Sequence, residues 1–316
     1  MKKQSLGCLL IFIAIVSCAA EPSAETKKII RDGAKAKLTF RVTDSLSKPV
    51  TNVNISVSFM FLEHGKGSVI NATTDTNGLC TVEALCGKEV YCYFTKNGYY
   101  QTSFHHKYLT TYPTLDNVKD GKWQPWNPTI EITLKEKRNP ISMITKDMLI
   151  KLPKKNEPYG FDCKMGDLVI PYGKGEQADF DFTFSAINRG HIFDFKNELF
   201  ITAVQQDEGL IANTRDTWSQ FETDYEAQES GYLPEYHLML DRTPSKILQQ
   251  KELTGAEYLT FRSRIVRDEE GKIISSNYGK IMGIAYGLDD KNPEGGAVML
   301  FYFFNPTSND RNLESK

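Results

Sequence analysis

Alternation of apolar and polar side chains constrains the fold of this chain more than any other feature of its sequence. Every odd position from 53 to 61 carries an apolar side chain, and Asn54, Ser56 and Ser58 stand between them. Successive side chains of a β-strand point to opposite faces, so this alternation predicts a strand with one buried face. A chain that repeats such segments folds into β-sheets, and we expect an all-β protein.

Residues 36–137 contain seven segments of this kind, and together they predict a β-sandwich. The segments lie at 38–42, 53–61, 68–74, 79–84, 90–95, 100–108 and 129–135. Turn-forming residues separate them, notably DTNG at 75–78 and KNG at 96–98. Short strands with turns at this spacing are typical of a β-sandwich.

The order of these motifs resembles that of carboxypeptidase regulatory-like domains. The matching stretches are FRVTD at 40–44, KPV at 48–50, TDTNG at 74–78 and KNGY at 96–99. They correspond to the family's opening strand, its "D…GKPV" turn, its "TDxNG" turn and its "KxGY" stretch. The resemblance covers residues 36–137 and implies a seven-stranded transthyretin-like sandwich that acts as an accessory module without peptidase residues. The chain departs from the family pattern at 46–47, where the family often has glycine, and in a long loop at 110–128.

Residues 138–316 predict a second domain, because a charged run and then Asn139-Pro140 interrupt the strand pattern. Strands are expected at 148–152, 178–188, 199–205, 236–240, 258–268, 273–288 and 297–304. A hairpin turn is expected at 268–271, a long loop at 215–233 and a short helix at 247–253. We expect an antiparallel sandwich or jelly roll. The GKI, NPT and RNLE stretches at 279–281, 305–307 and 311–314 resemble only uncharacterised exported lipoproteins, which implies no known activity.

The first residues of the chain predict export. Lys2 and Lys3 precede an apolar run at 6–16 that is too short for a stable membrane anchor. The run ends in IVSC at 15–18, which resembles the lipobox of bacterial lipoproteins. That resemblance implies a leader at 1–18, lipidation of Cys18, a tether at 19–35, and a lipid-anchored protein of the cell envelope, facing the periplasm or the surface. Ordinary signal-peptide cleavage after Ala20 is the alternative.

Charge and motif content limit the other partners. The chain has 38 basic and 40 acidic side chains, a formal net charge of -2, which argues against a nucleic-acid partner. Past the leader no apolar run is long enough for a membrane span. The DTNG turn lacks the remaining ligands of an EF-hand, and His105 and His106 point to opposite faces of a strand, so no metal site or cofactor is expected.

The cysteines beyond the leader are Cys80, Cys86, Cys92 and Cys163. If Cys86 is the centre of a hairpin turn, Cys80 faces Cys92 across the two strands and a disulfide between them is expected. A shift of one residue in register would remove this match. The alternative is a set of small buried thiols, which are common in strands.

Two tryptophans in the long loop at 110–128 are the leading candidates for ligand contact. Trp123 and Trp126 flank a proline, and Tyr112 lies nearby. Indoles presented on a loop form a flat apolar platform that suits a sugar ring or a peptide. The alternative is that these tryptophans plug the end of the sandwich or join the two domains.

A second aromatic group occupies the loop at 215–233, where acidic residues interleave with Trp218, Phe221, Tyr225 and Tyr232. Such a loop suits sugar hydroxyls or a calcium ion, and the alternative is that its aromatic side chains fold back on the sheet.

Catalytic motifs are weak throughout the sequence. Asp179 and Asp181 have the spacing of two carboxylates on one strand face, and Glu235 with His237 could form a general-base pair. Both spacings are ordinary in solvent-facing strands, and the sequence has no nucleophile elbow, HExxH or P-loop. We therefore expect a non-catalytic role in binding a glycan or an envelope protein, or in scaffolding. The alternative is an envelope hydrolase that acts on carbohydrate through C-terminal carboxylates.

Overall fold

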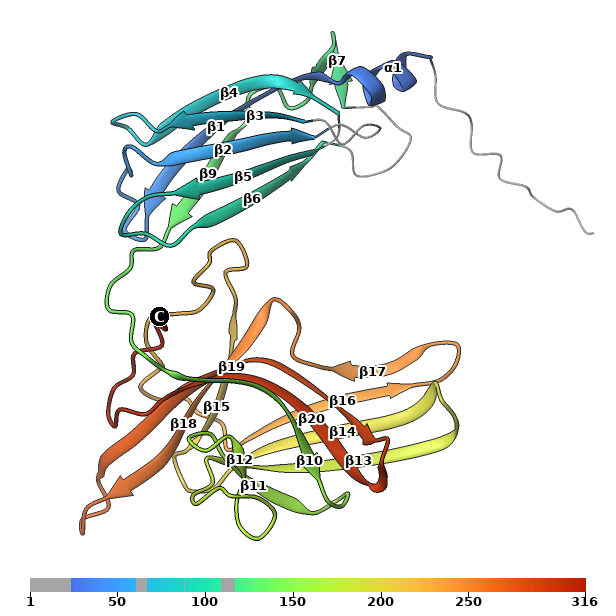
Figure 1. Ribbon diagram of the computed structural model, residues 1–316, viewed down its shortest axis with the longest axis vertical. Helices are drawn as coiled ribbons and strands as arrows, with labels where there is room; N and C mark the ends of the chain where they lie inside the picture. The colour runs from blue at the N-terminus through green and yellow to red at the C-terminus, as the bar shows by residue number, and fades with distance from the viewer. Residues whose placement is uncertain (1–23, 61–66, 88, 109–116) are drawn as a thin grey trace, which may run out of the picture. The chain divides into compact units, whose positions relative to one another are not determined.

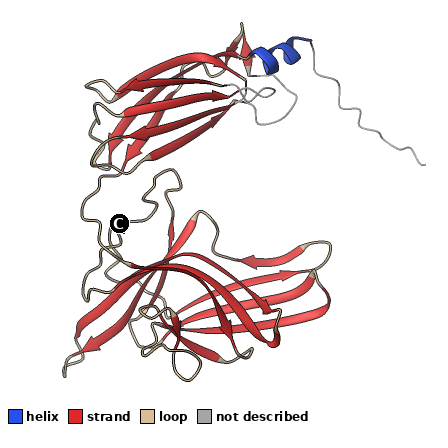
Figure 2. Cartoon of the chain, in the orientation of Figure 1, coloured by secondary structure: helices blue, strands red, loops and turns tan. Residues whose placement is uncertain are grey.

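The computed structural model describes residues 24–60, 67–87, 89–108 and 117–316, and nearly all of its regular structure is β (Figures 1 and 2). The predicted all-β fold is therefore confirmed. The chain divides into two compact units. The first consists of residues 1–42, 49–94 and 104–132, and the second of residues 43–48, 95–103 and 133–316. The main division at 132/133 lies close to the predicted boundary after residue 137.

Seven longer strands build the first sandwich, as predicted. They are β1 (Ala34–Asp44), β2 (Asn54–Met60), β3 (Ser68–Thr73), β4 (Leu79–Cys86), β5 (Glu89–Thr95), β6 (Thr102–Lys107) and β9 (Thr129–Leu134). Two short strands, β7 (Val118–Lys119) and β8 (Lys122–Trp123), extend one sheet. That sheet has the order β4-β1-β8-β7, with β9 also paired to β1, and the other has the order β3-β2-β5-β6. The alternating apolar residues of β2 are buried between the sheets, as the pattern at 53–61 requires.

The segment 19–35, expected to be a tether, contains helix α1 (Ala24–Asp32) and the first residues of β1. One prediction for this part of the chain needs correction. The hairpin that was to bring Cys80 opposite Cys92 is not formed, because β4 and β5 belong to different sheets. Cys80 instead pairs with Phe40 of β1, and Cys80 and Cys92 are both free thiols. The predicted Cys80–Cys92 disulfide is thus absent, and the alternative of small buried thiols describes these residues.

The second unit is an antiparallel sandwich of two larger sheets. One has the order β10-β20-β19-β18-β15 and the other β12-β11-β13-β14-β16-β17. The strands are β10 (Ile144–Leu152), β11 (Pro158–Asp162), β12 (Asp167–Leu168), β13 (Phe180–His191), β14 (Asp194–Ala203), β15 (Gly209–Thr214), β16 (Glu235–Arg242), β17 (Ile247–Lys251), β18 (Glu257–Arg267), β19 (Ile273–Asp289) and β20 (Asn292–Asn305). A core of aromatic and branched side chains from both sheets, including Phe182, Phe261 and Leu300, fills the space between them. The predicted second sandwich is confirmed.

Of three local predictions for this unit, the turn and the long loop agree with the structure and the short helix does not. The turn expected at 268–271 joins β18 to β19, and Gly271 adopts a positive φ of 82° there. Residues 215–233 contain no named strand or helix, as predicted for a long loop. The helix predicted at 247–253 is wrong, because Ile247–Lys251 pairs with β16 as the edge strand β17. An exposed edge strand lacks the alternation of buried and exposed residues that identifies a strand.

Candidate functional site

The two predicted tryptophans differ in what they can contact. Trp123 is only 1% exposed. Its indole Nε1 donates a hydrogen bond of 2.7 Å to the backbone oxygen of Cys86, and its ring stacks on Tyr108 with the centroids 5.2 Å apart. A buried indole needs such a partner, so Trp123 is a core residue of the first unit. The prediction that Trp123 contributes to a ligand platform was wrong.

Trp126 is half-buried and lies beside two lysines. The Nζ atoms of Lys122 and Lys37 lie 5.0 Å and 6.0 Å from its ring centroid, within the range of cation–π contacts. Tyr112, the third residue of the predicted platform, lies outside the described residues. Of the predicted group, Trp126 is therefore the one side chain described here that retains access to a ligand.

The long loop at 215–233 packs against its own unit through its aromatic side chains. Phe221 is buried, and its ring centroid lies 5.0 Å from that of Tyr225. The backbone N–H of Asp224 donates to the hydroxyl of Tyr258 in β18, and that hydroxyl donates to Asp224 Oδ2, both at 3.0 Å. The alternative that this loop folds back on the sheet is thus the correct one for Phe221, whereas Trp218 stays 46% exposed.

A buried lysine fastens both the loop and the C-terminal tail to the outer face of β19. Lys280 is 3% exposed, and its Nζ donates to the hydroxyl of Thr223 at 3.0 Å and to the backbone oxygen of Leu313 at 2.7 Å. The rings of Phe221 and Phe303 lie 5.1 Å and 4.9 Å from the same atom. Burial lowers the pKa of Lys280 to about 7. One side chain therefore connects three segments that are far apart in the sequence.

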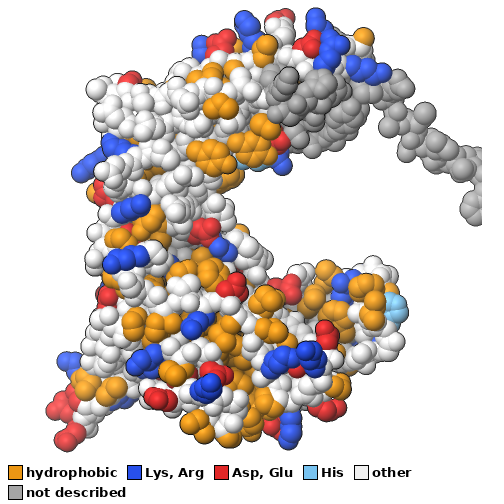
Figure 3. All heavy atoms as spheres, in the orientation of Figure 1, with side chains coloured by type: hydrophobic (Ala, Val, Ile, Leu, Met, Phe, Trp, Pro, Cys, Tyr) orange, Lys and Arg blue, Asp and Glu red, His pale blue; other side chains and the backbone are white. Residues whose placement is uncertain are grey.

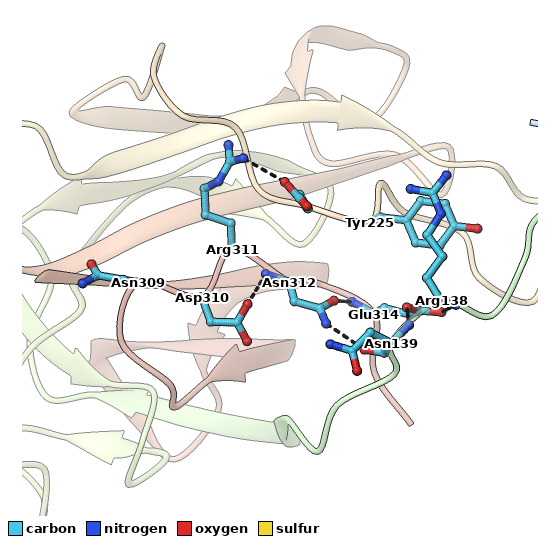
Figure 4. Close-up of a pocket in the computed structure, with 9 residues that line it drawn as sticks. Arg138, Asn139, Tyr225, Asn309, Asp310, Arg311, Asn312 and Glu314 are labelled. Atoms are coloured by element: carbon cyan, nitrogen blue, oxygen red, sulfur yellow. Dashed lines mark hydrogen bonds and ion pairs between the residues drawn. The ribbon is translucent and has the colours of Figure 1, made fainter. Parts of the chain in front are cut away.

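Next to this anchor the loop, the tail and the segment after β9 form an open pocket of about 370 Å³ (Figure 4). Its lining comprises Arg138, Asn139, Tyr225, Glu226, Asn309, Asp310, Arg311, Asn312 and Glu314. Eight of these nine side chains are amides, carboxylates or guanidinium groups, which are planar polar groups with fixed hydrogen-bonding directions. The volume lies within the range of small-molecule sites, although the polar lining is unusual among them.

The three carboxylates of the pocket are held in place by their own partners. Glu314 accepts hydrogen bonds from the backbone N–H groups of Arg138 and Asn139 at 2.8 Å and 2.6 Å. Asp310 accepts bonds from the backbone of Asn312 and from the amide of Asn305. Glu226 forms an ion pair of 2.8 Å with Arg311. These bonds hold the walls rigid, which favours recognition because less conformational freedom is lost when a ligand binds.

Two polar groups of the pocket remain available for a ligand. The guanidinium of Arg138 lies over the ring of Tyr225, with its Cζ 3.8 Å from the centroid, and the two side chains overlap in Figure 4. Within the part of the chain that the structure describes, neither this guanidinium nor the side-chain amide of Asn139 makes a hydrogen bond or ion pair. Both side chains are exposed. The hydroxyl of Tyr225 donates to the backbone oxygen of Glu136 at 2.6 Å, which fixes the ring that supports Arg138.

The carboxylates considered for catalysis do not converge on this pocket. Asp179 is buried, where it binds Arg264 Nε at 2.8 Å and the hydroxyl of Ser263 at 2.5 Å. Arg264 also binds Asp162. Burial alone would raise the pKa of Asp162, but hydrogen bonds from backbone N–H groups and from this arginine lower it overall. Asp181 lies on β13 and is half-buried, and burial raises its pKa. These three carboxylates, Asp162, Asp179 and Asp181, form no open catalytic pair.

The Glu235–His237 pair also has other partners. The ring of His237 stacks on Phe200 with the centroids 4.2 Å apart and the planes at 4°, and its Nε2 lies 3.2 Å from Glu198 Oε1. That approach lacks hydrogen-bond geometry. Glu235 and His237 share a face of β16, as predicted, but His237 contacts side chains of β14 rather than Glu235.

Sequence reasoning identified Tyr225 and Glu226 as members of an aromatic and acidic loop but missed the remaining pocket residues. Arg138 and Asn139 looked like a domain linker, and the tail at 309–314 carried no motif with a chemical meaning. The one signal that could have found them is the density of Asn, Asp and Arg at 309–312, which is high for a terminal segment.

Surface features outside the pocket add little to the assignment. The face drawn in Figure 3 carries acidic and basic side chains intermixed. Among the described residues, no helix is long and apolar enough to cross a membrane, and no group of three or more His, Cys, Asp or Glu side chains is arranged to hold a metal ion.

Comparisons with known proteins assign no family. No family model matches the chain, and no curated protein matches it either. Among solved structures, a shaft pilin (spaA) from Lactobacillus rhamnosus GG shares 11% identity over 74% of this chain and 89% of its own, with a TM-score of 0.23. A "putative carbohydrate binding protein" from Bacteroides uniformis shares 10% identity over 88% of this chain and 100% of its own, with a TM-score of 0.21.

A 3-chlorocatechol 1,2-dioxygenase from Rhodococcus opacus 1CP shares 12% identity, and the match spans 34% of this chain and 62% of the enzyme, with a TM-score of 0.27. Because all three TM-scores are 0.27 or lower, these similarities assign no ligand, partner or activity to the chain.

Proposed function

We propose that this chain is an exported, lipid-anchored protein of the cell envelope that binds a carbohydrate without catalysing a reaction. In this proposal the acyl chains are carried by Cys18, the first sandwich is an accessory module related to carboxypeptidase regulatory-like domains, and the ligand binds to the second unit. The pocket at Arg138, Asn139 and the tail is the observation that carries the proposal.

The chemistry of the pocket suits a sugar better than an apolar ligand. Each sugar hydroxyl both donates and accepts hydrogen bonds, so its recognition needs donors and acceptors in fixed positions. Arg138 supplies donors, Asn139 supplies both types, and the carboxylates of Asp310 and Glu226 have lone pairs beyond those already used. An apolar ligand would leave these groups unsatisfied, at a cost of about 1–3 kcal/mol for each buried group.

The proposal is tested by a glycan-array screen of the chain, followed by calorimetry with the best ligand. Arg138→Gln and Asn139→Ala remove the two available polar groups without removing a bond that holds the pocket together. Each variant should weaken binding by roughly tenfold or more, as expected for the loss of one or two hydrogen bonds to a charged or amide group. Lys272→Gln, in the turn between β18 and β19, is the matched control and should bind as the wild type does.

Trp126→Ala separates the pocket from the aromatic site that the sequence suggested. If a glycan binds and its affinity falls in Trp126→Ala but not in Arg138→Gln, the ligand site lies in the first unit and the pocket assignment is wrong. If no glycan on the array binds, the carbohydrate proposal itself fails. Release of cleaved sugar during incubation would contradict the non-catalytic part of the proposal.

A further inference from the structure

The turn between β13 and β14 carries apolar side chains where polar ones are the rule. The strand register pairs His191 with Asp194, so Ile192 and Phe193 are the two residues of the turn. Two-residue hairpin turns normally use Asn, Asp or Gly, whose backbones adopt the required conformations easily. Ile192 is nevertheless 78% exposed and Phe193 46%. Residues that break a local rule without burying anything in their own chain mark functional surface.

This turn is part of a larger surface, which we call the apex patch. The patch consists of the exposed side chains of Ile192, Phe193, Ile247 and Leu248, together with Arg242 and Lys246. Arg242 pairs with Phe195 on one side and with Ile247 of β17 on the other, and its guanidinium carbon lies 4.9 Å from the centroid of the Phe193 ring. In Figure 1 the β13–β14 turn and the β16–β17 turn lie at the same end of the second unit.

The charges of the apex patch are unevenly compensated. Asp194 and Asp241 are both ion-paired with Arg189, at 3.1 Å and 3.0 Å. Arg242 and Lys246 form no ion pair with any carboxylate in the described ranges. Lys246 is exposed, whereas Arg242 is half-buried and its Nε atom is buried without a hydrogen bond. At this end of the unit Figure 3 shows hydrophobic side chains beside basic ones. The patch therefore combines exposed apolar side chains with excess positive charge.

A bilayer surface fits this combination better than a protein does. A stable protein interface buries about 1,200–2,000 Å² between complementary surfaces, whereas a protruding two-residue turn offers little area and no pocket. At the boundary between head groups and acyl chains, apolar side chains enter the lipid while lysine and arginine bind anionic head groups. No complementary pocket is needed, because lipid closes around whatever protrudes.

We propose that the apex patch is a membrane-contact site, in which Ile192 and Phe193 enter the acyl boundary of a bilayer while Arg242 and Lys246 bind anionic phospholipid head groups. This site is independent of the carbohydrate pocket and of a lipid at Cys18. It would hold the second unit against a membrane even in a chain that carries no acyl group.

The test uses residues 19–316, which retain both units and lack the lipidation site, in flotation with lipid vesicles. The chain should float with vesicles of phosphatidylcholine and phosphatidylglycerol, and more weakly with phosphatidylcholine alone. Ile192→Ser with Phe193→Ser should lower the partition coefficient by roughly tenfold or more. Lys246→Gln should reduce binding to the vesicles that contain phosphatidylglycerol and should not change binding to vesicles of pure phosphatidylcholine. Ile170→Ser, which changes another highly exposed isoleucine in a different loop, should leave binding to both vesicle types unchanged.

Folding of the variants is checked by circular dichroism, and the double variant should melt as the wild type does because neither side chain is buried. As a second measurement, Phe193→Trp should show a blue shift of its added emission on anionic vesicles. Absence of wild-type flotation with both vesicle types overturns the proposal, as does unchanged flotation of the double variant. A dimer that becomes a monomer in the double variant, without vesicle binding, would overturn it in favour of self-association.

Discussion

At the scale of single residues, Lys280 shows how a titratable group can be buried on the outer face of a β-sheet, beneath a loop and the C-terminal tail. Its ammonium group is removed from water, which disfavours the charged form and lowers its pKa to about 7, while Glu222 raises the pKa and Lys135 lowers it. The amine that remains after loss of the proton still has two N–H groups. It can therefore continue to bind the Thr223 hydroxyl and the Leu313 oxygen, so the pocket walls stay fastened in both protonation states.

The shifted pKa of Lys280 predicts that the contribution of this residue to stability rises with pH. Because the folded pKa lies below the ordinary value of 10.5, the folded state releases its proton first as the pH increases. Between these two values the unfolded state binds more protons at this residue, so the contribution of Lys280 to the free energy of unfolding should grow by about 3 kcal/mol from pH 7 to pH 10. Lys280→Met should remove that increase, and Lys272→Met should keep it. Parallel pH profiles for the wild type and Lys280→Met, measured by urea unfolding, would contradict this account.

At the scale of elements, alternation identifies a strand but not the sheet to which it belongs. β4 and β5 were recognised correctly, and their cysteines lie on buried faces. The chain nevertheless passes from one sheet to the other between Cys86 and Glu89, because a sandwich can be wound in many ways with the same strands. The disulfide prediction depended on a hairpin pairing that local sequence does not encode.

The free cysteines predict a definite chemical outcome. Residues 19–316, unfolded without reductant, should react with Ellman's reagent at four thiols, and at three in Cys92→Ser. In the folded protein the reaction should be much slower, because burial raises the pKa of Cys92 to about 12 and little reactive thiolate is present. Recovery of only two thiols, together with a linked Cys80–Cys92 peptide in mass spectrometry, would restore the disulfide.

Elements without a buried, alternating face escaped the sequence analysis. β17 is exposed along its whole length, and β12 has only two residues, so neither gives a periodic signal.

At the scale of the whole molecule, the same limit of local sequence patterns explains why the pocket was not predicted. Arg138, Tyr225 and Asn312 come from three irregular segments. The packing around Lys280 and the backbone hydrogen bonds between the loop and the tail bring two of those segments together. The two sandwiches could be predicted because their cores repeat a local pattern, whereas the pocket is a product of tertiary packing.

The proposed attachment to a membrane is also a property of the whole molecule, and it is decided at Cys18. If the IVSC sequence at 15–18 is processed as in lipoproteins, the mature chain begins at Cys18 and carries several acyl chains, which together give durable anchoring. Cells expressing the wild type and fed a palmitate analogue should then yield a labelled protein in the membrane fraction. Cys18→Ala should carry no label, whereas Cys8→Ala, a change in the same leader, should be labelled as the wild type is. An unlabelled wild-type protein whose first residue is Glu21 would instead establish ordinary cleavage after Ala20, and the second unit would then depend on the apex patch for any contact with a membrane.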